Sequence, residues 1–198
     1  MGRLLYSTIA SLDGYITDAD GEFDWAEPDP EVHAFINDLE RPVGTYLYGR
    51  RTYEVMAYWE TAALDPASEP EGPDAERAAV ALDYAELWRA AEKVVYSTSL
   101  EEVSTARTRL ERTFDPDAVR ALVAASDTDV GLGGAMLAAE AMRAGLVDEY
   151  HVFTFPVIVG GGTPHYPAGV RANLQLLESR TFASGVVYAR YAVREVAP

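Results

Sequence analysis

The stretch VGLGGAMLAAEAMRAGLVDEYHVFTFPVIV, residues 130–159, decides the fold class. An apolar run meets a Gly-Gly pair, a helical pattern of apolar residues begins at once, Gly145 ends it, and a second apolar run follows. This order predicts a strand, a tight glycine turn, a helix and a second strand. Repeated along a chain, such units build an α/β fold with a parallel sheet.

The pair Gly133-Gly134 at the strand-to-helix turn has two interpretations. Glycines let a phosphate approach the backbone, where free N–H groups and the positive end of the helix favour an anion. They equally allow a tight turn with close packing and no ligand. The pair alone does not choose between them.

The composition indicates one globular domain. With 198 residues, 48% of them hydrophobic, the chain can bury a sizeable core. It has no apolar run of about 18 residues and no signal pattern, so we expect a cytoplasmic protein that does not enter a membrane. The absence of cysteine excludes disulfides and thiolate metal sites. A net charge of −16 opposes nucleic-acid binding, so a bound phosphate needs a local cluster of positive charge.

Residues 3–10 (RLLYSTIA) predict a first, central strand, and Asp13 follows its end. Open α/β sheets bind ligands at the carboxyl ends of their strands, which makes Asp13 a candidate catalytic residue. The alternative is an Asp that accepts turn N–H groups before Gly14. Farther on, Asp20-Gly21 predicts a hairpin turn.

A first helix is predicted to begin at Asp29-Pro30, with Asp29 as its N-cap. Apolar residues at i, i+3, i+4 and i+7 form its core-facing stripe, namely Val32, Phe35, Ile36 and Leu39. His33 lies off this stripe, so we expect it to be solvated. No second histidine stands at ligand spacing, and we expect no metal site.

The segment GRRTYE, residues 49–54, predicts a second turn from a strand at 45–48 into a helix. Two guanidinium groups at a helix N-terminus oppose the helix dipole, which favours an anion between Arg50 and Arg51 over a structural role. The alternative is that both are solvated and paired with some of the 32 acidic residues.

The middle of the chain begins with residues 61–76 (TAALDPASEPEGPDAE). Their prolines and acids predict an irregular surface insertion that borders the ligand-binding crevice at the carboxyl ends of the strands. Residues 77–91 predict a helix and residues 93–97 a strand. The hydroxyl cluster Ser97, Thr98 and Ser99 suits either a phosphate or the capping of the next turn. A strand at 107–114 and a helix from Asp115-Pro116 follow.

The chain closes with a glycine loop at 160–162 and a hairpin of residues 174–182 and 186–193 around Ser184-Gly185. The predicted fold is α/β: an open, mostly parallel mixed sheet flanked by helices, with a C-terminal antiparallel hairpin. The strand ends at Gly49, Ser97 and Gly133 offer three anion-friendly turns, enough for the phosphates of a dinucleotide.

Five segments in order resemble the dihydrofolate reductase superfamily: SLDGYI (11–16), GRRTYE (49–54), VVYSTSL (94–100), GGAML (133–137) and LVDEYHVFTFPVIVGGG (146–162). The resemblance covers nearly the whole chain. It is closest to the branch related to the C-terminal reductase domain of the bifunctional riboflavin-biosynthesis deaminase-reductase. It implies a single dihydrofolate reductase-like domain that binds NADPH, without the zinc motif of the deaminase, which needs cysteines.

The resemblance also implies which residues contact the cofactor. The nicotinamide would lie against Ile9 and Ala10. The ribose and phosphate groups would be held by residues of three turns: Gly49, Arg50, Arg51, Thr52, Ser97, Thr98, Ser99, Gly133, Gly134, Ala135, Met136 and Leu137.

On the substrate side, the resemblance implies Asp13, Trp25, Glu31 and Tyr53. Two departures concern the substrate: Leu137 stands where folate reductases have a tyrosine, and the loop around Asp13 and Trp25 differs. Glu31, four residues before Phe35, matches the spacing of the folate-binding acid. A carboxylate is also favoured in a first helical turn without any ligand.

We therefore expect an NADPH-dependent reductase that transfers a hydride to a small carbonyl, C=N or pterin- or pyrimidine-like substrate. Asp13, or a water that it holds, would supply the proton. The alternative is a non-catalytic nucleotide-binding or regulatory protein that keeps the fold. Tyr150, Val152 and Phe153, with the hairpin of residues 174–193, give more apolar surface than one sheet face needs, which predicts a homodimer as in relatives with this fold.

Overall fold

The structure is a computed structural model that describes residues 2–62 and 73–194. Its main sheet has eight strands: β1 (Leu4–Ser11), β3 (Val43–Gly49), β4 (Glu92–Tyr96), β5 (Thr108–Glu111), β6 (Asp129–Gly133), β7 (Glu149–Phe155), β9 (Leu174–Thr181) and β10 (Val187–Val193). Their order is β5-β4-β3-β6-β1-β7-β10-β9. All pairs from β5 to β7 are parallel, and β10 is antiparallel to β7 and β9. The predicted mixed sheet with a C-terminal hairpin is confirmed.

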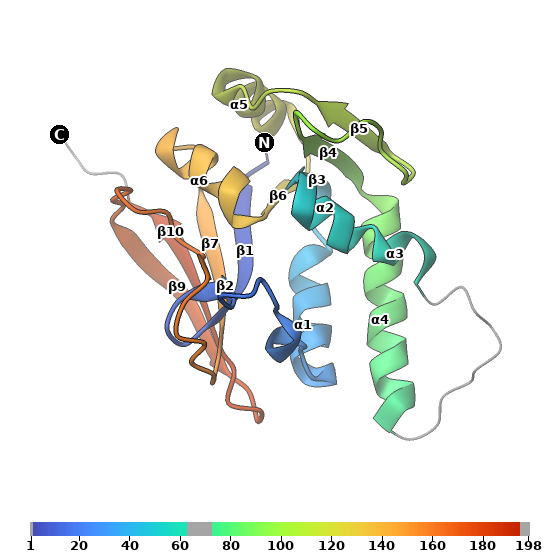
Figure 1. Ribbon diagram of the computed structural model, residues 1–198, viewed down its shortest axis with the longest axis vertical. Coiled ribbons are helices and arrows are strands. Elements are labelled where there is room, and N and C mark those ends of the chain that lie inside the picture. Colours follow the sequence, from blue (N-terminus) through green and yellow to red (C-terminus); the bar gives the residue numbers. More distant parts are fainter. Residues whose placement is uncertain (1, 63–72, 195–198) are drawn as a thin grey trace.

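Helices cover both faces of this sheet (Figure 1). Along β1, Leu4 and Tyr6 face one layer and Leu5 and Ile9 the other, because side chains alternate along a strand. The first face carries α5 (Pro116–Ala125) and α6 (Ala135–Arg143), and the second carries α1 (Pro30–Glu40), α2 (Arg50–Met56), α3 (Tyr58–Thr61) and α4 (Pro73–Ala90). No helix of the described residues has the length and apolar character that a membrane crossing needs.

The helix ends follow the predicted capping signals. The side chain of Asp29 accepts a hydrogen bond from the backbone N–H of Val32 at 3.0 Å, with proline in the first turn of α1. Asp115 begins α5 in the same way. At the end of α6, Gly145 adopts a φ of 64°, and the N–H of Leu146 donates to Ala141 O at 3.0 Å. These short-range signals therefore predicted the starts of α1 and α5 and the end of α6.

The predicted hairpin turn at Asp20-Gly21 is wrong. The short strand β2 (Tyr15–Thr17) pairs instead with β8 (Thr163–Pro164), far along the chain. The carboxylate of Asp18 accepts hydrogen bonds from the N–H groups of Asp20 and Glu22, both at 2.9 Å, and closes a local turn. This turn leads into the 3-10 helix η1 (Asp24–Ala26) rather than into a second hairpin strand.

The expected solvation of His33 is also wrong. Its ring centroid lies 6.0 Å from that of Trp59 and 5.8 Å from that of Tyr84, and burial lowers its pKa. The cause is α4, which packs beside α1 and covers a flank that the helical stripe had left to solvent. Of the predicted insertion, residues 63–72 lie outside the described residues, and α4 begins at Pro73, four residues earlier than expected.

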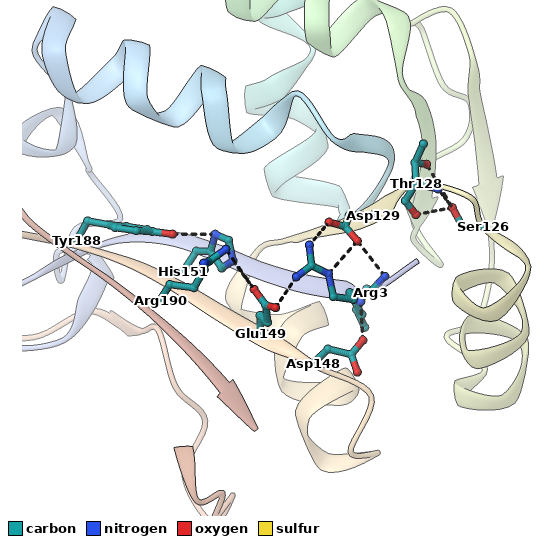
Figure 2. A network of polar contacts seen from close by, with 10 residues as sticks. Arg3, Ser126, Thr128, Asp129, Asp148, Glu149, His151, Tyr188 and Arg190 are labelled. Atoms are coloured by element: carbon teal, nitrogen blue, oxygen red, sulfur yellow. Dashed lines mark hydrogen bonds and ion pairs between the residues drawn. The ribbon is translucent and has the colours of Figure 1, made fainter. Parts of the chain in front are cut away.

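A polar network joins the amino ends of β1, β6, β7 and the adjacent β10 (Figure 2). The guanidinium of Arg3 contacts Asp129 (Nη2–Oδ2 2.5 Å) and Glu149 (Nη1–Oε1 2.5 Å). Glu149 Oε2 also lies 3.3 Å from His151 Nε2, and the hydroxyl of Tyr188 lies 3.2 Å from His151 Nδ1. The network connects strands β1, β6, β7 and β10 near the amino ends of β1, β6 and β7. The three predicted phosphate-binding turns lie at the opposite end of the sheet, after the carboxyl ends of the parallel strands.

Candidate functional site

The three predicted anion-binding turns lie side by side at the carboxyl ends of β4, β3 and β6. In the sheet register, Gly49 pairs with Tyr96 and Tyr48 pairs with Gly133. Because these strands are parallel and adjacent, the residues that follow them leave the sheet at the same edge. The structure thus brings together segments that are far apart in the sequence.

Thr52 at the start of α2 packs directly on Gly134. A Cβ at Gly134 would stand 2.3 Å from Thr52 Oγ1, and the φ of Gly134 is 94°. At Gly133, a Cβ would stand 2.8 Å from the ring of Tyr48. Both positions therefore require glycine for close packing, and Gly134 requires it for its backbone conformation as well. The packing interpretation of the Gly-Gly pair accounts for these contacts, which also place the Thr52 hydroxyl beside the amino end of α6.

Arg50 links the α2 turn to the turn after β4. Its Nη1 donates to Ser99 Oγ at 3.0 Å, and its Nε donates to Glu54 Oε1 at 2.7 Å. Arg50 thus follows the alternative stated above, in which the arginines of this turn pair with acidic residues. Arg51 is exposed, and within the described part of the chain no acidic group lies at ion-pair distance from it. One guanidinium is held in place at this edge, and the other is available to an anion.

The turn after β4 is held by its own hydrogen bonds. Ser97 Oγ accepts from the N–H of Leu100 at 2.9 Å, which is the capping role and not a ligand contact. Thr98 and Ser99 are exposed at the surface. Arg112 donates to the carbonyl oxygens of Ser97 (3.3 Å) and Leu100 (2.5 Å), so it positions the whole turn. Sequence reasoning missed Arg112 because an arginine after an edge strand has no distinguishing pattern.

The first residues of α6 divide between the core and the surface. Ala135 and Leu137 are 8% and 6% exposed, whereas Met136 is 81% exposed. Leu137 also lies close to Gly49, since a Cβ there would stand 3.9 Å from the Leu137 Cβ. Of the expected contacts in this turn, only Met136 therefore offers its side chain to a ligand at the surface.

Ile9 and Trp25 lie in the same apolar cluster at the carboxyl half of β1, together with Phe153. The indole Nε1 of Trp25 is buried and has no hydrogen-bond partner among residues 2–62 and 73–194. A buried donor without a partner costs free energy, so an acceptor supplied by a ligand would be favoured there. Ala10 is only 1% exposed and presents little beyond its backbone.

The carboxylate of Asp13 is occupied by backbone groups. It accepts hydrogen bonds from Val159 N (Oδ1, 3.2 Å) and Gly160 N (Oδ2, 2.8 Å). A hydrogen bond from Ser11 and these two backbone contacts hold the pKa of Asp13 below its usual value. Asp13 is therefore ionised at neutral pH and is a poor proton donor. The turn-binding alternative accounts for this carboxylate, although its partners come from a distant loop.

Two predicted substrate residues have other partners. Glu31 Oε1 accepts from Arg180 Nη2 at 2.8 Å, at an exposed position on the hairpin side of α1. Tyr53 is only 2% exposed, and its hydroxyl accepts from the N–H groups of Ser104 (2.8 Å) and Thr105 (3.2 Å). Tyr53 is therefore a packing residue in the core below α2, and the contacts give Glu31 a role at the surface.

The charged and polar groups at this edge suit phosphate rather than metal. In the described ranges, no group of three His, Asp or Glu side chains is placed to hold a metal ion. The turns carry several donors, namely the guanidinium groups of Arg50 and Arg51 and the hydroxyls of Thr52 and Ser99, together with one carboxylate, Glu54, on Arg50. Such donors fit the phosphates of a dinucleotide.

A sequence profile of the RibD C-terminal domain matches residues 3–188. The chain belongs to this family. The "Uncharacterized protein YyaP" of Bacillus subtilis (strain 168) is 29% identical over 194 residues, which are 96% of this chain and 94% of the relative. The RibD C-terminal domain is a reductase domain, so the predicted family and its general class of activity agree with the match.

Two solved structures show the fold of this RibD C-terminal domain. A candidate riboflavin biosynthesis protein from Shewanella sp. PV-4 has a TM-score of 0.72 at 20% identity and covers 98% of this chain and 100% of its own. Dihydrofolate reductase from Enterococcus faecalis, complexed with NADP(H), has a TM-score of 0.63 at 13% identity and covers 98% of both chains. The predicted dihydrofolate reductase-like fold is therefore confirmed.

The contact between Gly134 and Thr52 yields a first prediction. In Gly134→Ala, the new Cβ meets Thr52 Oγ1 and the backbone is strained at positive φ. We therefore expect the free energy of unfolding to fall by about 2 to 4 kcal/mol. Gly145→Ala is the matched control, because φ is 64° there but nothing lies within 4 Å of the new Cβ. It should cost about 1 kcal/mol. Urea unfolding of both variants measures the difference, and equal losses would contradict the role of the Thr52 contact.

Proposed function

We propose that this RibD C-terminal domain is an NADPH-dependent reductase of a small carbonyl, C=N or pterin- or pyrimidine-like substrate. The observation that carries the proposal is the junction of three turns at one sheet edge, where Thr52 lies against Gly134 and Arg50 bonds Ser99. Parallel strands bind ligands at this edge. Family membership supports the reductase class.

The chain's own residues would bind and orient the two reactants. Arg51 and the Arg50–Ser99 pair would hold phosphate groups, and Gly133 and Gly134 would let the ligand approach the backbone before α6. When bound, NADPH supplies the hydride. Ile9 and Trp25 would exclude water on the substrate side, and the indole N–H of Trp25 would donate to an oxygen or nitrogen of the substrate.

Proton delivery separates this proposal from its alternative. The carboxylate of Asp13 accepts hydrogen bonds from the backbone N–H groups of Val159 and Gly160, so solvent is the source of the proton in our proposal. The same observation favours the second candidate, a nucleotide-binding protein that keeps the fold without turnover, since the carboxylate of Asp13 is engaged and is not poised to protonate a substrate.

Two measurements test the proposal on the full chain. Calorimetry should detect NADPH binding that is tighter than NADH binding. Loss of NADPH absorbance with a panel of small carbonyl, imine and dihydropterin compounds should reveal turnover. Binding without turnover of any compound would favour the nucleotide-binding alternative, and absence of dinucleotide binding would rule out both.

Tyr150, Val152 and Phe153, expected to add apolar surface, are buried in the core, so that part of the prediction is wrong. The C-terminal hairpin does expose apolar side chains to which a second copy of the chain could bind. Leu176 and Leu177 on the outer strand β9 are 53% and 42% exposed, and Val187 and Val193 on β10 are 41% and 39% exposed. Exposed apolar side chains on an edge strand favour association. We propose a homodimer through this hairpin.

Light scattering at micromolar concentration should give the mass of a dimer. Leu176→Glu with Leu177→Glu should give a monomer, because two charges would have to be buried at the contact. Leu82→Glu, at a side chain of α4 that is 40% exposed, is the control and should leave the dimer intact. A monomeric wild-type chain would contradict this interface.

A further inference from the structure

The loops that follow β1 and β7 are fastened to each other by hydrogen bonds. The N–H of Leu12 donates to Val157 O at 2.8 Å. Next to it, Asp13 accepts from Val159 N at 3.2 Å and Gly160 N at 2.8 Å, one bond on each carboxylate oxygen. Asp13 is exposed, yet both of its oxygens are used across a sequence separation of about 146 residues.

Further contacts extend this junction on the far side of Asp13. The carbonyl of Gly14 accepts from the N–H of His165 at 3.1 Å, and His165 Nδ1 lies 2.7 Å from the same oxygen. The hydroxyls of Thr17 and Thr163 are 3.1 Å apart. None of these contacts uses a carboxylate, so Asp13 supplies the only carboxylate contact between the two loops among the described residues.

The contact between these two loops lies next to the apolar cluster of the proposed site. On one side is the carboxyl half of β1, with Ile9 in the apolar cluster that also contains Trp25. On the other side are the exposed tips of the two loops, where Leu12 is 63% and Ile158 is 70% exposed. Trp25 follows this loop and β2 in the chain, and its 3-10 helix η1 contacts β1, which carries Ile9.

We propose that Asp13 is a positioning residue that ties the loop after β1 to the loop after β7. It thereby holds the side chains of Trp25 and Ile9 in the relative position that the reduction needs. This inference rests on the proposed reductase function for its catalytic consequence, but the tie itself does not. Ionised carboxylates make stronger hydrogen bonds to backbone N–H groups than neutral acceptors do. The carboxylate thus acts through the loop, and it does not transfer a proton.

A pair of substitutions separates positioning from proton donation. Asp13→Asn keeps one acceptor oxygen and loses the ionisable proton, whereas Asp13→Ala loses both oxygens. We expect Asp13→Ala to lower kcat about 10- to 100-fold, since small misplacements near the reacting atoms have effects of that size. Asp13→Asn keeps one of the two bonds and should lose less of kcat than Asp13→Ala, and the pH profile should keep its shape in both variants. Equal loss in Asn and Ala variants would overturn the proposal in favour of an acid.

Hydrogen exchange tests the tie without turnover. The amide protons of Val159 and Gly160 should exchange at least tenfold faster in Asp13→Ala than in the wild type, while the amide of His165, bonded to Gly14 O, should change little. Unchanged exchange at Val159 and Gly160 would overturn the tie. A wild-type chain that exchanges as expected but turns nothing over would overturn the proposed function, and with it the catalytic consequence, while supporting the tie.

Asp18→Ala is the matched control. Its carboxylate also accepts from two backbone N–H groups, but both belong to its own loop. It should leave the exchange of Val159 and Gly160 unchanged and should alter kcat less than Asp13→Ala does. A loss of kcat in Asp18→Ala equal to that in Asp13→Ala would overturn a specific role for the contact between the loops. Dinucleotide affinity, measured by calorimetry, should stay within about threefold in all variants, because every contact changed lies away from the three phosphate-facing turns.

Discussion

Replacing Arg50 and Arg51 together with alanine should weaken NADPH binding by about two to four orders of magnitude, because each charge-assisted contact contributes about 1.5 to 3 kcal/mol. The extra 2′-phosphate of NADPH carries nearly two negative charges, and a chain with net charge −16 repels it unless a local pair of cations reverses the field. NADH should lose far less. Calorimetry with both cofactors on wild type and variant measures the difference.

The contacts of Arg50 sharpen this experiment. Its Nε already donates to Glu54, so Glu54 reduces the positive field at the turn. Glu54→Gln should tighten NADPH binding by up to about fivefold, in line with the small contribution of exposed pairs. Arg143→Ala controls for charge, because Arg143 forms a similar exposed pair with Glu140 at the far end of α6. Equal losses for NADPH and NADH in the double variant would assign the arginines to the shared pyrophosphate or to the fold.

Replacing Arg3 with methionine should lower the free energy of unfolding about as much as Gly134→Ala does. Asp129 and Glu149 would lose their contacts with the guanidinium of Arg3, and their side chains are only 10% and 8% exposed in the wild type. Breaking a buried pair costs about 3 to 5 kcal/mol. Arg3 itself is 47% exposed, so water screens part of the interaction and we expect about 2 to 4 kcal/mol by urea unfolding. Arg120→Met, which breaks an exposed pair with Asp117, should cost less than about 0.5 kcal/mol.

The same substitution should change how stability depends on pH. Burial disfavours the charged form of Asp129, but the hydrogen bonds and charge of Arg3 outweigh it and hold the pKa of Asp129 below its usual value. A carboxyl group whose pKa is lower in the folded chain stabilises the fold above the unfolded pKa of about 3.9. This contribution to stability is lost as the pH falls through the folded pKa. The cost of Arg3→Met should therefore shrink between about pH 4 and pH 2. A cost that stays constant over this range would contradict the assignment.

His151 adds a second acid-sensitive contribution. Burial is the largest influence on it and lowers its pKa, although Glu149 opposes this shift. The unfolded chain then takes up a proton below about pH 6.5 that the folded chain resists, so stability should fall as pH drops below that value. His151→Gln should flatten this part of the curve, which urea unfolding between pH 5 and pH 7 would measure.

Local signals predicted the elements because their physical causes are local. Asp29 and Asp115 stand next to prolines and cap helices with bonds that span a few residues. The glycine turn before α6 and Gly145 after it mark the ends of that helix. The errors came from contacts between distant segments. β2 pairs with β8 and not with its neighbour, and α4 covers His33 on a flank that the periodicity of α1 left open.

The candidate site divides in the same way. The residue types and their positions after strands were visible in the sequence, because phosphate needs donors and glycines wherever the fold places them. Their partners were not visible. Thr52 against Gly134, Arg50 on Ser99 and Asp13 on Gly160 each depend on sheet register and on loops far apart in the chain.

The sequence by itself determined the order of strands and helices, the family resemblance and the three turns that offer groups to an anion. Only the tertiary structure decided what each group does: Arg50 is paired, Arg51 has no acidic partner among residues 2–62 and 73–194, Tyr53 is buried, and Asp13 accepts from backbone amides. The physical reason is that periodicity and capping act over a few residues, whereas the ionisation and availability of a side chain depend on whatever the folded chain places beside it.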